Sequence, residues 1–194
     1  MWVRRSAIRP IPRYARLPES SIQGLEATFS AADAHAQQLA RASYERLTQQ
    51  QPALTAYLSR KLSASLDDTA LALGHMLALA VYVGFEAFAG GTLRSLTPEA
   101  VAAADQALSA DEELRRADPR DALDSEDIVA IDQPALVAFV NEHIERTLEQ
   151  HAEAVDVDDV DVVFRAVLVE IVALSHAVPA PAGYLPPLGE EPQA

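Results

Sequence analysis

One stretch occurs twice in the chain and decides the fold: "QPALTAYL" at residues 51–58 and "QPALVAFV" at residues 133–140. The leading Gln, Pro, Ala and Leu recur at the same four positions, 82 residues apart. Proline suits the first turn of an α-helix, where its missing N–H would have no partner. Each copy therefore predicts the start of a helix, and the repetition predicts that two parts of the chain fold alike.

The two copies keep their apolar positions and change their outward ones. Apolar residues recur at steps of four, as Leu54, Leu58 and Leu62 in the first copy and Leu136, Val140 and Ile144 in the second. Arg60, by contrast, aligns with Glu142, and Ser63 aligns with Glu145. Side chains four residues apart lie on one helix face. The pattern thus predicts two helices with equivalent buried faces, unless "QPAL" is a common helix start that recurs by accident.

A helix that is apolar on all sides is expected after each copy. The first is "TALALGHMLALAVYVGFEAFAG" at residues 69–90, and the second follows "DVDDVD" at residues 156–161. The two apolar runs align by pattern at an offset of 91 residues. A helix that is hydrophobic all round must be buried, and small residues such as Gly74 and Gly84 let neighbouring helices approach closely. We therefore place these two helices at the centre.

The resulting expectation is an all-α helical bundle of about six main helices, built from two tandem pseudo-repeats at 20–91 and 97–178. Each repeat runs from an amphipathic helix to a Pro-initiated amphipathic helix and then to a buried helix. An exposed acidic loop is predicted at 117–131, with Asp132 capping the second copy. A basic, Pro-containing arm at 1–19 and a Pro-rich C-terminal tail at 179–194 flank the bundle.

Charge and composition narrow the class of protein. The chain has 194 residues, a net charge of −14 and no Cys, which excludes disulfides, thiolate metal sites and Cys nucleophiles. The first 19 residues carry five Arg and one acid, a net +4, so the remainder carries −18 and repels nucleic-acid phosphates. One Lys against 14 Arg, with abundant Ala, is typical of a GC-rich, bacterial genome. No apolar leader is visible, so we expect a cytoplasmic protein.

Both arms carry groups that suit a partner. The expected partner-binding residues are aromatic, apolar or basic, and they are Trp2, Arg4, Arg5, Arg9, Arg13, Tyr184 and Leu185. The N-terminal arm either lies across the acidic body through Arg–carboxylate pairs or reaches a partner chain, a membrane or nucleic acid. The tail contains five Pro in 16 residues, which favours an extended form. Its "YLPPL" either covers an apolar groove of its own domain, lies loose, or docks on another chain.

Standard catalytic and metal-binding signatures do not occur in the sequence. It has no Gly-rich phosphate loop, nucleophile elbow or H-E-x-x-H motif, and no His follows a Glu by three residues, as a di-metal bundle requires. "DVDDVD" resembles the start of a calcium loop, but Val160 and Val167 stand where ligands are needed. Capping of a helix is its expected role. We expect no catalytic residue, no metal site and no cofactor.

Five polar residues lie inside or at the ends of the two apolar runs: His75, Glu86, Arg165, Glu170 and His176. An unpaired buried charge is so costly that pairing is nearly forced. These residues either form structural pairs or line a ligand-binding or catalytic pocket. The first run is short for a bilayer, and the second contains Arg165 and Glu170, which are expensive in lipid. No membrane span is expected.

Three functions of different classes remain. The favoured one is a non-catalytic, acidic helical interaction module, such as an adaptor, a regulatory subunit or an immunity- or antitoxin-like inhibitor of a basic partner. The second is a small-molecule-binding or enzymatic bundle, which needs a cavity between the central helices. The third is nucleic-acid contact through the N-terminal Arg arm. Self-association is compatible with the first, and Arg165 paired with an acid would count against the second.

Overall fold

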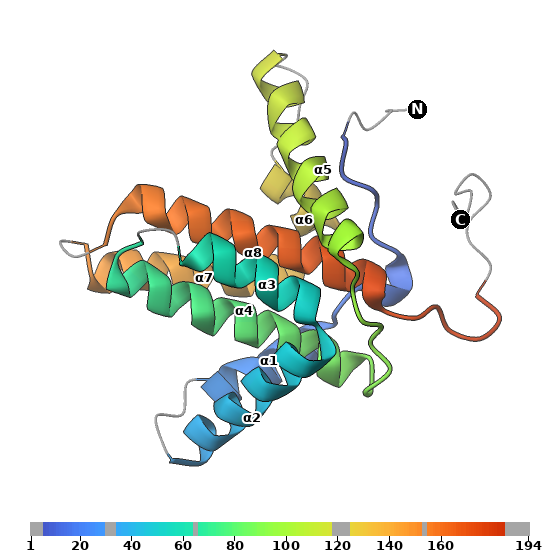
Figure 1. The fold of residues 1–194 in the computed structure, drawn as a ribbon, viewed down its shortest axis with the longest axis horizontal. Helices are drawn as coiled ribbons and strands as arrows, with labels where there is room; N and C mark the ends of the chain where they lie inside the picture. The colour runs from blue at the N-terminus through green and yellow to red at the C-terminus, as the bar shows by residue number, and fades with distance from the viewer. Residues whose placement is uncertain (1–5, 30–33, 64–65, 118–124, 153–154, 185–194) are drawn as a thin grey trace.

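The computed structural model shows an all-α protein (Figure 1). It describes residues 6–29, 34–63, 66–117, 125–152 and 155–184, without the side chains of 26–29 and 34–36. These residues form eight α-helices and one short 3₁₀ turn, whereas the sequence predicted about six main helices. The elements are η1 (Arg13–Ala15), α1 (Glu19–Phe29), α2 (Ala34–Gln50), α3 (Pro52–Leu62), α4 (Asp68–Phe88), α5 (Pro98–Ala117), α6 (Ser125–Asp132), α7 (Pro134–Gln150) and α8 (Val157–Ala177).

The acidic loop predicted at 117–131 is wrong for the residues that the structure describes there. α5 continues to Ala117, and α6 begins at 125, while residues 118–124 lie outside the described part. α6 forms because Ile128 and Val129 are buried. Glu126 and Asp127 lie in its first turn, where the helix dipole favours negative charge. A cluster of acids therefore marks a helix start here instead of a loop.

The N-terminal arm packs on the body through apolar side chains. Ile8, Ile11 and Leu17 are buried. The backbone N–H of Ile11 donates to Oδ2 of Asp132 at 3.1 Å. Asp132 therefore does not cap the second copy as predicted: the N-cap residue of α7 is Gln133, whose side chain makes no capping hydrogen bond.

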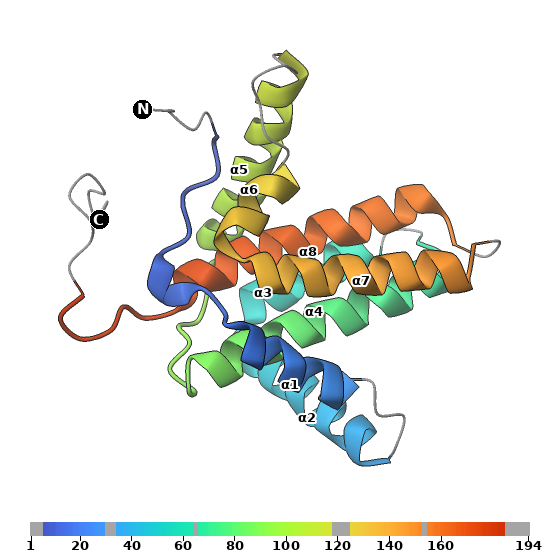
Figure 2. The ribbon, with the colours of Figure 1, turned by 180° about the vertical axis from the view of Figure 1, so that it is seen from behind.

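The centre of the fold is formed by α4 and α8, which lie side by side and run in the same direction (Figures 1 and 2). Their N-termini are tied together. The backbone N–H of Asp67 donates to Asp159 Oδ2 at 2.7 Å, and that of Asp156 donates to Asp67 Oδ2 at 2.9 Å. Asp67 and Asp156 are also the N-caps of the two helices. The caps lie 89 residues apart, two fewer than the offset that aligns the apolar runs by pattern.

Two glycines of α4 mark places where neighbours approach its backbone. A Cβ atom at Gly74 would lie 2.8 Å from Cδ2 of Leu62. A Cβ atom at Gly84 would lie 3.1 Å from side-chain atoms of both Leu17 and Leu25. Larger side chains at these positions would displace well-packed leucines, which costs stability. The small residues thus fix how closely α3 and α1 pack on the central helix.

The peripheral helices surround the central pair in two matching sets. α1 contacts α4 and α7, as α5 contacts α8 and α3. α2 packs on α3 and α4, as α6 packs on α7 and α8. The α1–α2 pair projects from one side of the central helices and the α5–α6 pair from the opposite side (Figures 1 and 2). These contacts of one half therefore have counterparts in the other.

The first repeated glutamine is a buried bridge. Gln51 has no exposed surface. Its Nε2 donates to the carbonyl of Arg94 at 3.0 Å, and its Oε1 accepts from the N–H of Leu96 at 2.9 Å. A side-chain amide carries a donor and an acceptor side by side, so it pairs with extended backbone at two points. Gln51 thus holds the segment that leads into α5.

The second repeated glutamine does the same work on the N-terminal arm. Nε2 of Gln133 donates to the carbonyl of Ala15 at 2.8 Å, and its Oε1 accepts from the N–H of Leu17 at 2.9 Å. Nε2 also donates to Oγ of Ser175 at 3.0 Å. The backbone angles agree as well, with φ −128° and ψ 56° at Gln51 and φ −131° and ψ 56° at Gln133. The two copies are equivalent in side chain and backbone.

We predict that Gln133→Met lowers the free energy of unfolding by about 2 to 4 kcal/mol, because it leaves buried backbone groups of the arm without partners. Methionine has a similar size, so the change removes the hydrogen bonds with little change in packing. Urea denaturation of the variant and the parent measures the loss. The matched control is Gln150→Met at the exposed end of α7, and losses of similar size in both variants would contradict the bridging role.

Candidate functional site

Arg165 of α8 forms the centre of a polar cluster with α5. Its guanidinium donates to Asp105, to Oε1 of Glu112 at 2.9 Å and to Oγ of Ser109 at 2.7 Å. The hydroxyl of Tyr57 lies 3.2 Å from Asp105 Oδ1 and donates to it. Burial acts to raise the pKa of Asp105, but the hydrogen bond and charge of Arg165 hold it below its usual value. Arg165 is therefore paired within the fold.

Glu86, near the end of α4, has structural partners as well. Arg46 of α2 binds it through two hydrogen bonds, Nε to Oε1 at 2.7 Å and Nη2 to Oε2 at 2.9 Å, a bidentate geometry that is among the stronger ion pairs. The hydroxyl of Tyr82 donates to Glu86 Oε1 at 3.1 Å. His75 of α4 is exposed instead of buried. Glu86 thus fastens α2 to the central helix.

Glu170 and His176 are the polar groups of α8 that lack such partners. Glu170 is fully buried, and neither of its carboxyl oxygens has a hydrogen-bond partner among the described residues. Burial raises its pKa well above the usual range, which favours the neutral form. Burial lowers the pKa of His176, and the charge of Arg9 acts in the same direction. The five predicted ligand-binding residues thus do not meet in one site.

We predict that Glu170→Gln changes how stability depends on pH. The wild-type carboxyl has a raised pKa in the folded state, so its contribution is fully present below the usual pKa of 4.5 and is lost as pH rises above it. The lost stability grows by up to about 1.4 kcal/mol per pH unit until the folded pKa is reached. Urea denaturation at pH 4.5, 6.0 and 7.5 should therefore show the variant gaining on the parent as pH rises. A constant difference across this range would contradict the raised pKa.

The predicted partner-binding residues of the arms fall in different places. Arg9 and Arg13 are exposed. The ring of Tyr184 packs edge-on against Tyr14 of η1, with 4.7 Å between the ring centroids. Trp2, Arg4, Arg5 and Leu185 lie outside the described residues. The described part of the N-terminal arm lies on its own domain, as one of the two sequence interpretations expected.

An apolar groove with acidic residues in its lining lies between α7 and α8, and we call it the acidic groove. Its volume is about 300 Å³. Its apolar lining consists of Ile144, Leu148, Val157, Val160 and Phe164. Glu126, Glu145 and Asp161 also line it, and no basic side chain among the described residues does. Val157 is 59% exposed, so a large apolar side chain faces solvent beside several carboxylates.

Half of the chain's net charge gathers around the acidic groove. Residues 142–161 contain eight acidic residues and one Arg, a net −7 out of −14. Glu145 and Glu149 are exposed and one turn apart on α7, where like charges repel. Asp158 is exposed in the first turn of α8. Such a concentration of one sign attracts cations and basic partners and speeds their association.

The groove is open because α6 is shorter than its counterpart α2. In the first half, Tyr44 of α2 covers the equivalent position, and only about 20 Å³ remains there. Leu62 lines that small space, and Ile144, 82 positions later, lines the acidic groove. Ser43 and Ser125 are buried at the same offset, but α2 starts nine residues before Ser43, whereas α6 starts at Ser125. A helix that ends early thus exposes the acidic groove.

Sequence reasoning assigned "DVDDVD" to helix capping alone and missed this groove. Asp156 does cap α8, accepting from the N–H of Asp158 at 2.9 Å. The overlooked signal is the pair of valines between the acids, because Val157 and Val162 are 59% and 40% exposed. Apolar residues that alternate with carboxylates on an exposed helix start indicate a contact surface.

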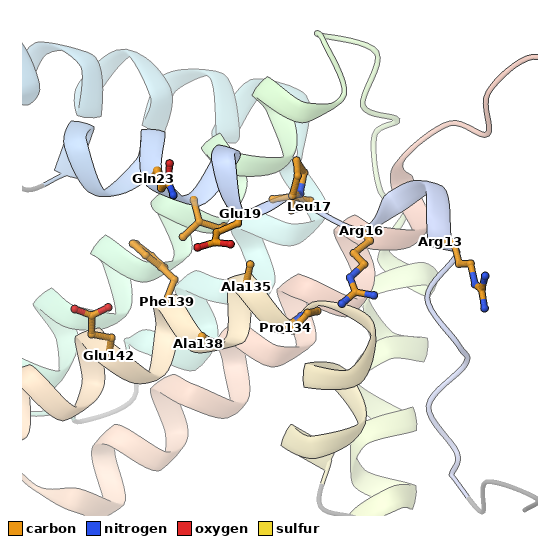
Figure 3. Close-up of a pocket in the computed structure, with 12 residues that line it drawn as sticks. Arg13, Arg16, Leu17, Glu19, Gln23, Pro134, Ala135, Ala138, Phe139 and Glu142 are labelled. Carbon is orange, nitrogen blue, oxygen red and sulfur yellow. The ribbon is translucent and has the colours of Figure 1, made fainter.

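A larger groove of about 770 Å³ lies between α1 and α7 (Figure 3). Apolar side chains line its middle, including Leu17, Ile22, Pro134, Ala135, Ala138 and Phe139. Arg13 and Arg16 lie toward one end and Glu142 toward the other (Figure 3). Its counterpart between α5 and α3 is smaller, at about 290 Å³. None of the five predicted ligand-binding residues lines the acidic groove or this one.

No protein-family model, curated protein or solved structure matches this chain. In the part of the chain that the structure describes, no group of three or more His, Asp or Glu is placed to hold a metal ion. α4 is long and apolar enough to cross a membrane, with a mean hydropathy of 1.6, but 56% of that window is buried inside the protein. A buried core helix meets the same criteria, so α4 alone does not establish a span.

Proposed function

We propose that this chain is a non-catalytic interaction module that binds a basic, amphipathic segment of a protein partner in the acidic groove. The observation that carries the proposal is that exposed apolar side chains and three carboxylates line one groove in the most acidic part of the chain. A basic amphipathic helix offers apolar residues at helical spacing with cations beside them. Its apolar face would cover Val157 and Phe164, and its cations would lie near Glu145 and Asp161.

The polar residues of the central helices support binding over catalysis. Arg165 and Glu86 are held by carboxylate and guanidinium partners within the fold. A general acid or base must come within hydrogen-bond reach of its substrate in a pocket. Neither residue lines the acidic groove or the α1–α7 groove. An adaptor, a regulatory subunit and an immunity- or antitoxin-like inhibitor all fit a binding role of this kind.

We also infer that the fold consists of two tandem pseudo-repeats, each with four helices instead of the predicted three. The proposed units are α1–α4 and α5–α8. Support comes from the matching helix contacts, from the identical bridging by Gln51 and Gln133, and from the equivalent caps Asp67 and Asp156. The acidic groove then marks a place where two related units differ.

We predict that Glu145→Lys combined with Asp161→Lys weakens binding of a basic amphipathic peptide about tenfold, because each reversed charge costs roughly 0.5 to 1 kcal/mol. The probe is a labelled 18-residue helical peptide of Lys and Leu, with Leu on one face, and fluorescence anisotropy measures its Kd. The matched control is Glu45→Lys combined with Glu113→Lys, two exposed positions on α2 and α5 that change the net charge equally. Equal weakening by both pairs would show that only net charge matters and would overturn the proposed site.

The apolar part of the proposal has its own test. Val157→Ser should weaken the same peptide about threefold to tenfold, because binding would bury a valine that is 59% exposed in the free protein. The stability of the variant should stay close to that of the parent, since the side chain has little to lose on its own domain. An unchanged Kd would remove Val157 from the contact and leave only charge attraction.

A further inference from the structure

A second hollow lies between η1 and the turn from α6 into α7, and we call it the basic hollow. Its volume is about 470 Å³, and it is lined by Ile11, Arg13, Arg16, Ile131 and Asp132. Ile131 is 52% exposed. Arg13 and Arg16 are exposed, and neither forms an ion pair with a described residue. The basic hollow thus presents an apolar side chain beside two guanidinium groups on an otherwise acidic protein.

The C-terminal part of the described chain comes to the same turn. Tyr184 packs on Tyr14, and the two rings meet edge to face at an angle of 76°. Tyr14 lies in η1 between the two arginines of the basic hollow. Gly183, at φ +81°, supplies the left-handed backbone that this approach requires. Residue 185 therefore follows directly from a side chain that is anchored next to the basic hollow.

We propose that residues 185–191, "LPPLGEE", fold back into the basic hollow of their own chain. Pro186 and Pro187 favour a polyproline II helix, which has three residues per turn. Leu185 and Leu188 are three residues apart and so lie on the same side of it. They cover Ile131, the exposed apolar side chain of the basic hollow.

Charge fixes the position of the segment. Glu190 and Glu191 supply carboxylates for Arg13 and Arg16, and such pairs are stronger when both guanidiniums stand in one recess. Six residues of polyproline II span about 19 Å, enough to pass from Tyr184 around η1 to the far arginine. The chain beyond residue 19 has a net charge of −18, so other faces of the body repel these glutamates. The basic hollow is therefore the favourable seat.

Introduced cysteines test the contact, because the chain has none of its own. Ile131→Cys combined with Leu188→Cys should form an intrachain disulfide under mild copper-phenanthroline oxidation, seen as a gel shift that reduction reverses. The rate should not change on tenfold dilution. The matched control is Leu114→Cys combined with Leu188→Cys, since Leu114 is 46% exposed on α5. We expect the control pair to oxidise at least tenfold more slowly.

A second set of variants tests the charge pairing. Adding Arg13→Glu and Arg16→Glu to the Ile131→Cys, Leu188→Cys chain should slow the disulfide at least tenfold, and circular dichroism checks that each variant folds. Equal rates for the two cysteine pairs, or no effect of charge reversal, would overturn the proposal. A disulfide that forms only between chains, at a rate that rises with concentration, would overturn docking within one chain and assign the segment to a second copy. Peptide binding in the acidic groove is measured separately, so the two proposals fail independently.

Discussion

The structure depends on one constraint, which is that α4 and α8 are apolar on every side. Two helices placed side by side cover only one face of each other, so the remaining faces need further helices. α1, α2 and α3 supply them around α4, and α5, α6 and α7 do so around α8. The parallel arrangement also brings two positive helix ends together, and the carboxylates of Asp67, Asp156 and Asp159 accept backbone N–H groups there.

Burying a core of this kind creates a second requirement, which the two glutamines meet. Extended backbone enters the packed region at residues 15–17 and 94–96, and buried N–H and C=O groups need partners. No neighbouring strand is available in an all-α arrangement. The amide of Gln133 or Gln51 acts as a strand edge reduced to one donor and one acceptor. This role accounts for why Gln and Pro recur together: the proline starts the helix and the glutamine fixes the segment that passes its end.

The sequence predicted what depends on local periodicity and missed what depends on distant neighbours. The apolar steps of four located α3 and α7, and the unbroken apolar runs located α4 and α8. The bridge formed by Gln133 was not predictable, because its backbone partner Ala15 lies 118 residues away. α6 was missed because its acids resemble a loop until Ile128 and Val129 are seen to be buried. The acidic groove was missed for a related reason: it depends on where α6 begins, which residue types alone do not reveal.

Within the proposed duplication, equivalent positions carry opposite charge, and this bears on specificity. Arg60 and Lys61 end α3 and lie near the ring of Tyr57, whereas the corresponding turn of α7 carries Glu142 and is followed by further acids. Two halves with one core but opposite surfaces cannot bind the same ligand, since a cation drawn to α7 is repelled from α3. Discrimination of this kind comes from the difference between two sites. A basic partner thus meets one orientation of a nearly symmetric molecule, and the electrostatic difference between the halves selects it.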